Sequence, residues 1–260
     1  MNLYLSTDKL DCRYTEDYIC DSVLYEKHCH GEFEIICILE GSIDLVYEGR
    51  SYRCSKGCVL VFPPLNYHSI AADPNTDYKR IAVVFRSDTF PREIERKLVN
   101  NADTCPVFYS PALISILSDL SKTVLTKDVN DYLPLIESLI VQTVYHCSDD
   151  EGQAHSPITE GDDNDLIRRA VEYIEAHINE KILLDDLAQA LFISKSSLCH
   201  LFTEKMQISP KQYILQKKIA YASMLIDAGS SSTDAARAIG YDNYSNFYRI
   251  YKKQQEKNNP

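Results

Sequence analysis

Residues 185–202 read DDLAQALFISKSSLCHLF, and residues 233–251 read TDAARAIGYDNYSNFYRIY. Each stretch contains a short segment with an alanine, a turn at Phe192–Ile193 or at Gly240, and a longer segment whose large apolar side chains recur at helical spacing. Two helices joined by such a tight turn are typical of a helix-turn-helix unit, whose second helix enters the major groove of DNA. The sequence therefore predicts two such units in one chain.

A predicted helix over 210–227 separates the two units. At 1.5 Å per residue it would be ~27 Å long, which places the two second helices near one duplex turn, ~34 Å, apart. If their apolar side chains face the core, their polar side chains face outward and are free to read bases. These outward residues are Ser196, Cys199, His200 and Thr203 in the first unit and Asp242, Ser245, Asn246 and Arg249 in the second. The alternative for this half is a helical bundle whose helices only pack together.

The two units carry a series of motifs: Leu187-Ala188, Ser194-x-x-x-Leu198-x-x-x-Phe202, Ser209-Pro210-x-x-Tyr213 and Gly240-Tyr241-x-x-x-x-x-Phe247-x-x-x-Tyr251-Lys252-Lys253. With these motifs, residues 182–253 resemble the DNA-binding domain of AraC/XylS-type transcription regulators. The resemblance implies base contacts from Ser196, Cys199, His200, Tyr244, Ser245, Asn246 and Arg249, and phosphate contacts from Lys195 and Lys252. Arg249 is the strongest candidate for a base contact, because a guanidinium group pairs bidentately with guanine.

The chain also departs from this family. Isoleucine is common in the family where this chain has Ser232 and Ala235, so we expect the short helix of the second unit to pack thinly. The usual arginine of the connecting helix is Lys218, and the usual glycine after the first reading helix is Gln207. These differences bear on DNA affinity more than on the fold.

The first half of the chain is predicted to be a β domain. Short segments rich in β-branched and aromatic residues alternate with Gly or Pro turns, which is typical of a β-sandwich or barrel. The predicted strands are Phe33–Leu39, Ser42–Tyr47, Ser51–Cys54, Val59–Phe62 and Arg80–Phe85.

Polar side chains with metal-ligand chemistry occur in this β half. His28, His30 and Glu34 share strand parity, which would point them to one face, and His68 would be a fourth ligand. Together with Gly41, Gly57 and Pro63 they resemble the paired motifs of cupin barrels, although Leu65 stands where a glycine is customary. The resemblance implies a site for Mn, Fe, Ni or Zn. We favour a metal-free pocket that hydrogen-bonds a polar effector, with no cofactor required; a purely structural barrel is the third reading.

Two further segments complete the domain plan. Apolar residues at helical spacing predict a hairpin of two amphipathic helices, whose apolar stripe covers either the barrel or the same hairpin of a second subunit. Residues 148–163 contain Gly, Pro and acids and predict a linker. We expect a cupin-like sensor over 1–110, the hairpin over 111–147, the linker over 148–163 and an all-α domain with two helix-turn-helix units over 164–260.

Composition restricts the class of protein. The 260 residues carry a net charge of −11, which by itself argues against a nucleic-acid partner. The charge is unevenly distributed, however: residues 1–162 carry 14 basic and 26 acidic side chains, whereas residues 163–260 carry 13 and 12. No apolar run approaches the length of a membrane span, and the N-terminus does not resemble a signal peptide. We expect a cytoplasmic protein with reduced cysteines and no membrane partner.

These observations predict a transcription regulator rather than an enzyme. A small-molecule effector in the cupin-like domain would alter binding of promoter DNA by the helical domain. The resemblance to AraC/XylS-type regulators implies activation of transcription more than repression. We expect a homodimer, and contact with RNA polymerase where it activates. The rival hypothesis is a cupin metalloenzyme whose helical part is an interaction module. A third is an architectural DNA-binding protein without a ligand.

Overall fold

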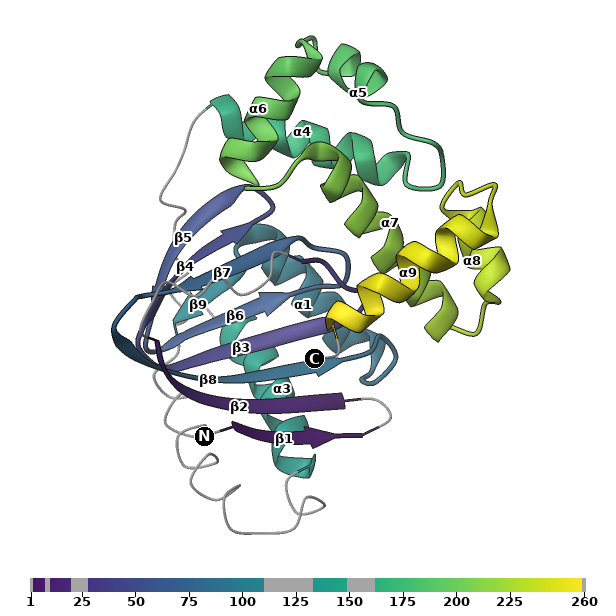
Figure 1. Ribbon diagram of the computed structural model, residues 1–260. Coiled ribbons are helices and arrows are strands. Elements are labelled where there is room, and N and C mark those ends of the chain that lie inside the picture. Colours follow the sequence, from purple (N-terminus) through teal and green to yellow (C-terminus); the bar gives the residue numbers. More distant parts are fainter. Residues whose placement is uncertain (1, 8–9, 20–27, 110–132, 149–161, 259–260) are drawn as a thin grey trace.

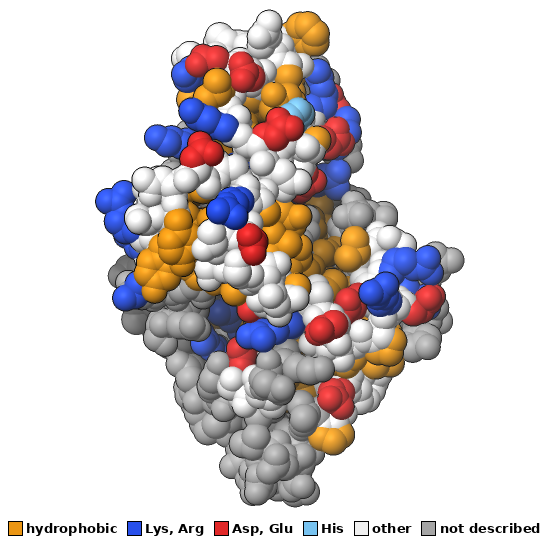
Figure 2. Space-filling model, turned by 90° about the vertical axis from the view of Figure 1, so that its right-hand side faces the viewer, with side chains coloured by type: hydrophobic (Ala, Val, Ile, Leu, Met, Phe, Trp, Pro, Cys, Tyr) orange, Lys and Arg blue, Asp and Glu red, His pale blue; other side chains and the backbone are white. Residues whose placement is uncertain are grey.

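The computed structural model describes residues 2–7, 10–19, 28–109, 133–148 and 162–258. A β domain is followed by an all-helical domain, which stands on one end of the β domain (Figure 1). The same stack is seen from its side in Figure 2. This order of domains confirms the architecture expected from the sequence.

The β domain consists of two antiparallel sheets. The larger sheet has the order β1-β2-β8-β3-β6-β9 and the smaller one the order β5-β4-β7. The strands are β1 (Asn2–Ser6), β2 (Leu10–Ile19), β3 (Phe33–Glu40), β4 (Ser42–Tyr47), β5 (Arg50–Ser55), β6 (Cys58–Phe62), β7 (His68–Ala72), β8 (Thr76–Phe85) and β9 (Val107–Tyr109).

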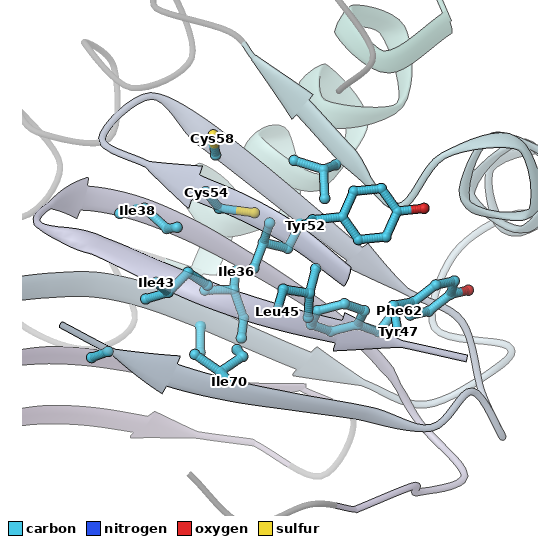
Figure 3. Packing of buried hydrophobic residues seen from close by; sticks show 14 of the residues in the cluster. Ile36, Ile38, Ile43, Leu45, Tyr47, Tyr52, Cys54, Cys58, Phe62 and Ile70 are labelled. Atoms are coloured by element: carbon cyan, nitrogen blue, oxygen red, sulfur yellow. The ribbon is translucent and has the colours of Figure 1, made fainter. Parts of the chain in front are cut away.

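The apolar run of β3 is explained by burial on both faces. Ile36 and Ile38 point into the layer between the two sheets, where they meet Ile43 and Leu45 of β4 (Figure 3). The alternate side chains of the strand, including Ile35 and Cys37, point to the opposite face and join a second core. A strand buried on both faces needs apolar residues at consecutive positions.

The second core is covered by helices α1 (Arg92–Thr104) and α3 (Leu133–Ser148). Leu98 of α1 and Ile136 and Ile140 of α3 are buried against the outer face of the larger sheet. The apolar stripe of α3 therefore covers the sheet of its own chain, at least at these two positions. The first helix of the predicted hairpin lies outside the described residues.

Several elements were not predicted: β1, β2, β7, β9 and α1. Helix α1 has a strongly polar composition, and its buried side is indicated by Ile94, Leu98 and Ala102 at four-residue spacing, with Val99 beside them. The predicted strand Arg80–Phe85 is the second half of a longer strand, β8. The first half of β8 was not predicted because Tyr78 is its only buried residue and the others are more exposed and polar.

The helical domain contains both predicted units. Helices α5 and α6 form the first and α8 and α9 the second, and the connecting helix α7 begins and ends at the predicted residues. The bounds are α4 (Asp162–Ala176), α5 (Leu184–Ala190), α6 (Lys195–Lys205), α7 (Pro210–Asp227), α8 (Ser232–Ala238) and α9 (Tyr244–Asn258). Within the described ranges, no helix is both long and apolar enough to span a membrane.

Serine caps explain where these helices begin. The hydroxyl group of Ser194 accepts a hydrogen bond from the amide of Ser197 at the start of α6. Ser209 and Gln212 form a reciprocal capping box at the start of α7, with Pro210 at its first position. The core of the second unit is small, since Ala222, Ala235 and Ala236 are three of its six fully buried residues. This agrees with the thin packing expected from Ala235.

Lys218 ties the second unit to the rest of the helical domain. Its Nζ donates to the carbonyl oxygens of Ile178 at 3.0 Å and Ile239 at 2.6 Å, and also to that of Glu180. Ile178 and Glu180 lie between α4 and α5, whereas Ile239 ends α8. A Cβ atom at Gly240 would lie only 3.0 Å from the carbonyl carbon of Glu180, so the two segments are in close contact.

We predict that Lys218→Met lowers the free energy of unfolding by ~2–4 kcal/mol, because three carbonyl groups lose a charged donor. Urea titration followed by circular dichroism measures the change. Lys211→Met is the matched control: Lys211 lies exposed on the same helix, and its replacement should change stability by less than ~0.5 kcal/mol. Equal changes in the free energy of unfolding for the two substitutions would contradict a stabilising role of the three Lys218 hydrogen bonds.

Candidate functional site

The first reading helix, α6, presents the predicted residues as expected from its period. Lys195, Ser196 and His200 are exposed and Cys199 is half-buried. Leu198, Leu201 and Phe202 are buried on the opposite side. Two of the outward side chains have acidic neighbours: Lys195 Nζ lies 2.9 Å from Asp185, and His200 Nε2 lies 3.6 Å from Glu204. Both acidic neighbours are exposed, so these contacts are easily exchanged for solvent or for another partner.

The second reading helix, α9, is arranged in the same way. Tyr244, Ser245, Asn246, Arg249 and Lys252 are all exposed, while Phe247 is fully buried. Arg249 donates to the side-chain oxygen of Asn246 at 3.1 Å. This contact holds the guanidinium group beside another candidate base contact. Figure 2 shows basic side chains spread over the helical part of this face, with acidic ones between them.

The predicted cluster of the β domain is also assembled. The candidate ligand atoms of His28, His30, Glu34 and His68 all lie within 4.8 Å of one another. Nε2 of His30 and Nε2 of His68 each lie 3.1 Å from the same carboxylate oxygen of Glu34. The parity argument holds only in part, because β3 begins at Phe33 and His28 pairs with His68 through an isolated backbone bridge.

Charge stabilises this cluster. Burial would raise the pKa of Glu34, but the hydrogen bonds from His30 and His68 outweigh burial and hold the pKa well below its ordinary value. Burial likewise works to lower the pKa of His30, but Glu34 and Glu32 raise it above its ordinary value. When His30 is protonated, its Nε2 and the carboxylate of Glu34, 3.1 Å apart, form an ion pair.

The cluster fits a divalent cation as well as a proton. Nδ1 of His30 bonds to the carbonyl oxygen of Glu32 at 3.0 Å, and Nδ1 of His68 bonds to that of Asn66 at 3.1 Å. Such bonds fix the rings with Nε2 toward Glu34, as is usual for histidines that bind metals. His28, His30, Glu34 and His68 would hold the ion, which would supply a fixed positive charge for an anionic or carbonyl ligand.

The two segments that form the cluster also contact the helical domain. His28 and His30 face the cluster, whereas Cys29 between them is buried among residues of α4 to α7. A Cβ atom at Gly31 would lie 3.1 Å from the carbonyl oxygen of Ala220 in α7, so the chain passes very close to this helix. On the other segment, Tyr67 precedes His68 and its hydroxyl donates to the carbonyl oxygen of Met206 at 2.9 Å.

A buried carboxylate completes this domain interface. Glu48, in the turn between β4 and β5, accepts hydrogen bonds from the amide of Tyr67 at 2.7 Å and from the hydroxyl of Tyr213 at 2.7 Å. Nζ of Lys217 lies 2.8 Å from Glu48 and 2.8 Å from Glu175, and its side chain is 2 % exposed. Burial would lower the pKa of Lys217, but the two carboxylates raise it above its ordinary value, so the lysine is charged.

Sequence reasoning missed this interface. One local feature could have indicated it: Lys217 follows Tyr213 by one helical turn, so a charged residue lies on the buried side of α7. Glu48 is 169 residues away and carries no sign of its partner. Beside Glu48, a hollow of about 160 Å³ opens between the two domains, lined by Tyr47, Glu48, Gly49, Arg50, Asn66, Arg168, Val171, Glu172 and Glu175.

Comparison with known proteins identifies both domains. The family model described as "AraC-like ligand binding domain" matches residues 14–137, and the model described as "Helix-turn-helix domain" matches residues 187–257.

Three relatives align with most of the chain. The uncharacterized HTH-type transcriptional regulator YbfI of Bacillus subtilis is 27% identical over 85% of this chain and 80% of its own length. The lactose operon transcription activator of Staphylococcus xylosus is 27% identical over 84% and 79%. The arabinose operon regulatory protein of Escherichia coli is 24% identical over 79% and 71%.

The fold and these matches define a DNA-binding transcription regulator with its own ligand-binding domain, and not an enzyme. The chain belongs to the AraC family, with a cupin-like N-terminal domain. This assignment confirms the resemblance expected from the sequence. The metalloenzyme hypothesis is set aside.

We predict that Lys217→Met destabilises the chain by ~3–5 kcal/mol, because Glu48, whose side chain is only 14% exposed, then has no cation. The double variant Glu48→Gln with Lys217→Met should recover more than half of the loss, since glutamine keeps an oxygen for the amide of Tyr67 and its NH2 group can donate to the hydroxyl of Tyr213. Urea unfolding of both variants and of Glu48→Gln alone gives the interaction free energy between the side chains of Glu48 and Lys217. Additive losses would show that the two side chains do not act as a pair.

Proposed function

We propose that a small polar molecule binds at the cluster of His28, His30, Glu34 and His68 and thereby alters the binding of promoter DNA by α6 and α9. This link is supported by the way side chains alternate in residues 28–31 and 67–68. In both segments, neighbouring side chains face the cluster and the helical domain in turn. A ligand that moves the imidazoles must therefore also move Cys29 or Tyr67 against the helices.

The DNA contacts are proposed residue by residue. Ser196, Cys199 and His200 on α6 and Tyr244, Ser245, Asn246 and Arg249 on α9 would contact base edges, and Lys195 and Lys252 would contact phosphates. They are supported by their place along one side of each reading helix, opposite the buried apolar residues, where all of them except the half-buried Cys199 are exposed. Arg249 would supply the strongest base discrimination, since only its side chain can pair bidentately with guanine.

The effector would carry oxygen atoms or a carboxylate, because the cluster offers imidazole donors around one carboxylate. We infer that no metal is required, since each ring nitrogen of His30 and of His68 already faces an oxygen atom of the chain. In this account the effector competes with Glu34 for the imidazole donors. Its binding energy is then available to shift the domain interface.

We further propose that the chain activates transcription, in line with its relative, the lactose operon transcription activator. Activation would involve contact with RNA polymerase. A homodimer also stays a prediction, and its interface would have to use surfaces other than Ile136 and Ile140, which are buried against the sheet of their own chain.

Arg249→Ala should weaken binding to a specific duplex by roughly ten- to a hundredfold and relax the base preference at one position. The probe is a duplex enriched from a randomised library by the unaltered chain. Lys195→Met should instead make the slope of log affinity against log salt concentration shallower by the amount expected for about one lost phosphate contact. Arg53→Ala, at an exposed arginine of the β domain paired with Asp44 and Asp73, is the control and should change neither quantity. Unchanged binding by both reading-helix variants would contradict the proposed interface.

The effector site is tested by a thermal-shift screen of polar metabolites on the full chain, with and without a chelator. Compounds that raise the Tm of the unaltered chain should lose this effect in Glu34→Gln and keep it in Arg249→Ala. They should also change the affinity for the enriched duplex. Hits that persist in Glu34→Gln would place the effector elsewhere, and hits abolished by the chelator would show that the site needs a metal.

A further inference from the structure

The turns of the two helix-turn-helix units have the same backbone structure. In each, two amides after the first helix bond back to carbonyl oxygens of that helix: Phe192 to Gln189 and Ile193 to Ala188, Gly240 to Arg237 and Tyr241 to Ala236, all at 3.0 Å. The first residue of each pair has a left-handed backbone, with φ of 59° at Phe192 and 75° at Gly240. Phe192 therefore occupies the position that a glycine occupies in the second unit.

A phenylalanine at this position is unfavourable for the free chain. A left-handed residue that ends a helix is usually glycine or asparagine, because a larger side chain crowds its own backbone. The Phe192 side chain is also 90% exposed, so its burial offers nothing in return. By contrast, Gly240 has no room for a side chain, as noted above. The unfavourable backbone and the exposed ring together make Phe192 a candidate contact for another molecule.

The position of the ring indicates what that molecule is. Phe192 lies two residues before Ser194, the cap of α6, and three before Lys195. The turn between α5 and α6, to which it belongs, is at the end of the helical domain farthest from the sheets (Figure 1). In helix-turn-helix units, the N-terminal end of the second helix is the end that contacts base edges. The second unit places an exposed aromatic side chain, Tyr244, at the first residue of its own reading helix.

We propose that Phe192 is a DNA contact, whose ring packs on the apolar edge of the duplex where α6 enters the major groove. This edge consists of thymine methyl groups and deoxyribose carbons, and phenylalanine is a known partner of the former. The proposal rests on the proposed use of α6 as a reading helix. It assigns the first unit an apolar contact that does not depend on charge.

Phe192→Gly and Phe192→Asn test the proposal in the full chain, because both residues accept a left-handed backbone. We expect each variant to bind the enriched duplex about tenfold more weakly, equivalent to about 1.4 kcal/mol, with the slope against salt concentration unchanged. The Tm of Phe192→Gly should equal or exceed that of the unaltered chain. Replacing thymine by uracil in the duplex removes the methyl groups and leaves the sugars unchanged. If the ring contacts a methyl group, the unaltered chain loses affinity for the uracil duplex and the variants do not. If the affinity of the unaltered chain is the same for both duplexes, the ring contacts the sugar.

Three results would overturn the proposal. Unchanged affinity in both variants excludes the contact, and a lower Tm in both variants assigns the ring a packing role instead. A change of molecular mass in light scattering without a change in affinity assigns it to contact between copies of the chain. Arg249→Ala and Lys195→Met, measured on the same duplex, separate this proposal from the wider one: if they reduce binding while the Phe192 variants do not, only the contact from Phe192 is wrong.

Discussion

The buried ammonium group of Lys217 is the interaction on which the arrangement of the two domains depends. It lies between Glu48 of the β domain and Glu175 of α4, and the same carboxylate of Glu48 holds the amide of Tyr67 and the hydroxyl of Tyr213. Charged groups are retained in such a place only when each has a partner with good geometry. One buried ammonium group therefore joins the ligand-binding domain to α4 and α7 of the helical domain.

The candidate effector cluster lies on the other side of the same short segments. His28 and His68 are paired through their backbones, and the residues next to them, Cys29 and Tyr67, are buried against the helices. Only the backbone of these two segments thus separates the cluster from the helical domain. Coupling between ligand and DNA needs no long relay of side chains in this chain, only a small shift of two extended segments.

The sequence was informative wherever a local pattern decides the structure. Serine caps, helical spacing and turn residues located both units and both ends of α7, because each signal lies within a few residues of the feature that it specifies. The outward faces of α6 and α9 followed from the same spacing. The cluster of four polar residues was recognised from motif spacing, even though His28 reaches it through a backbone bridge and not along a strand.

What the sequence did not indicate depends on distant partners. The pairing of Glu48 with Lys217 joins residues from opposite halves of the chain, and neither residue is unusual in its own surroundings. Helix α1 was missed because its buried side is narrow and its remaining residues are polar. Phe192 was recognised as part of a turn, but its left-handed backbone becomes apparent only beside Gly240.

Lys218 joins the end of α8 to the segment between α4 and α5, which leads into the first unit, and this has a consequence for the operator. Two rigidly joined readers require recognition elements at one fixed rotational phase, and one inserted base pair turns the second element by about 34–36°. Promoters under this regulator should therefore vary in sequence between the two elements, but not in the length of that interval.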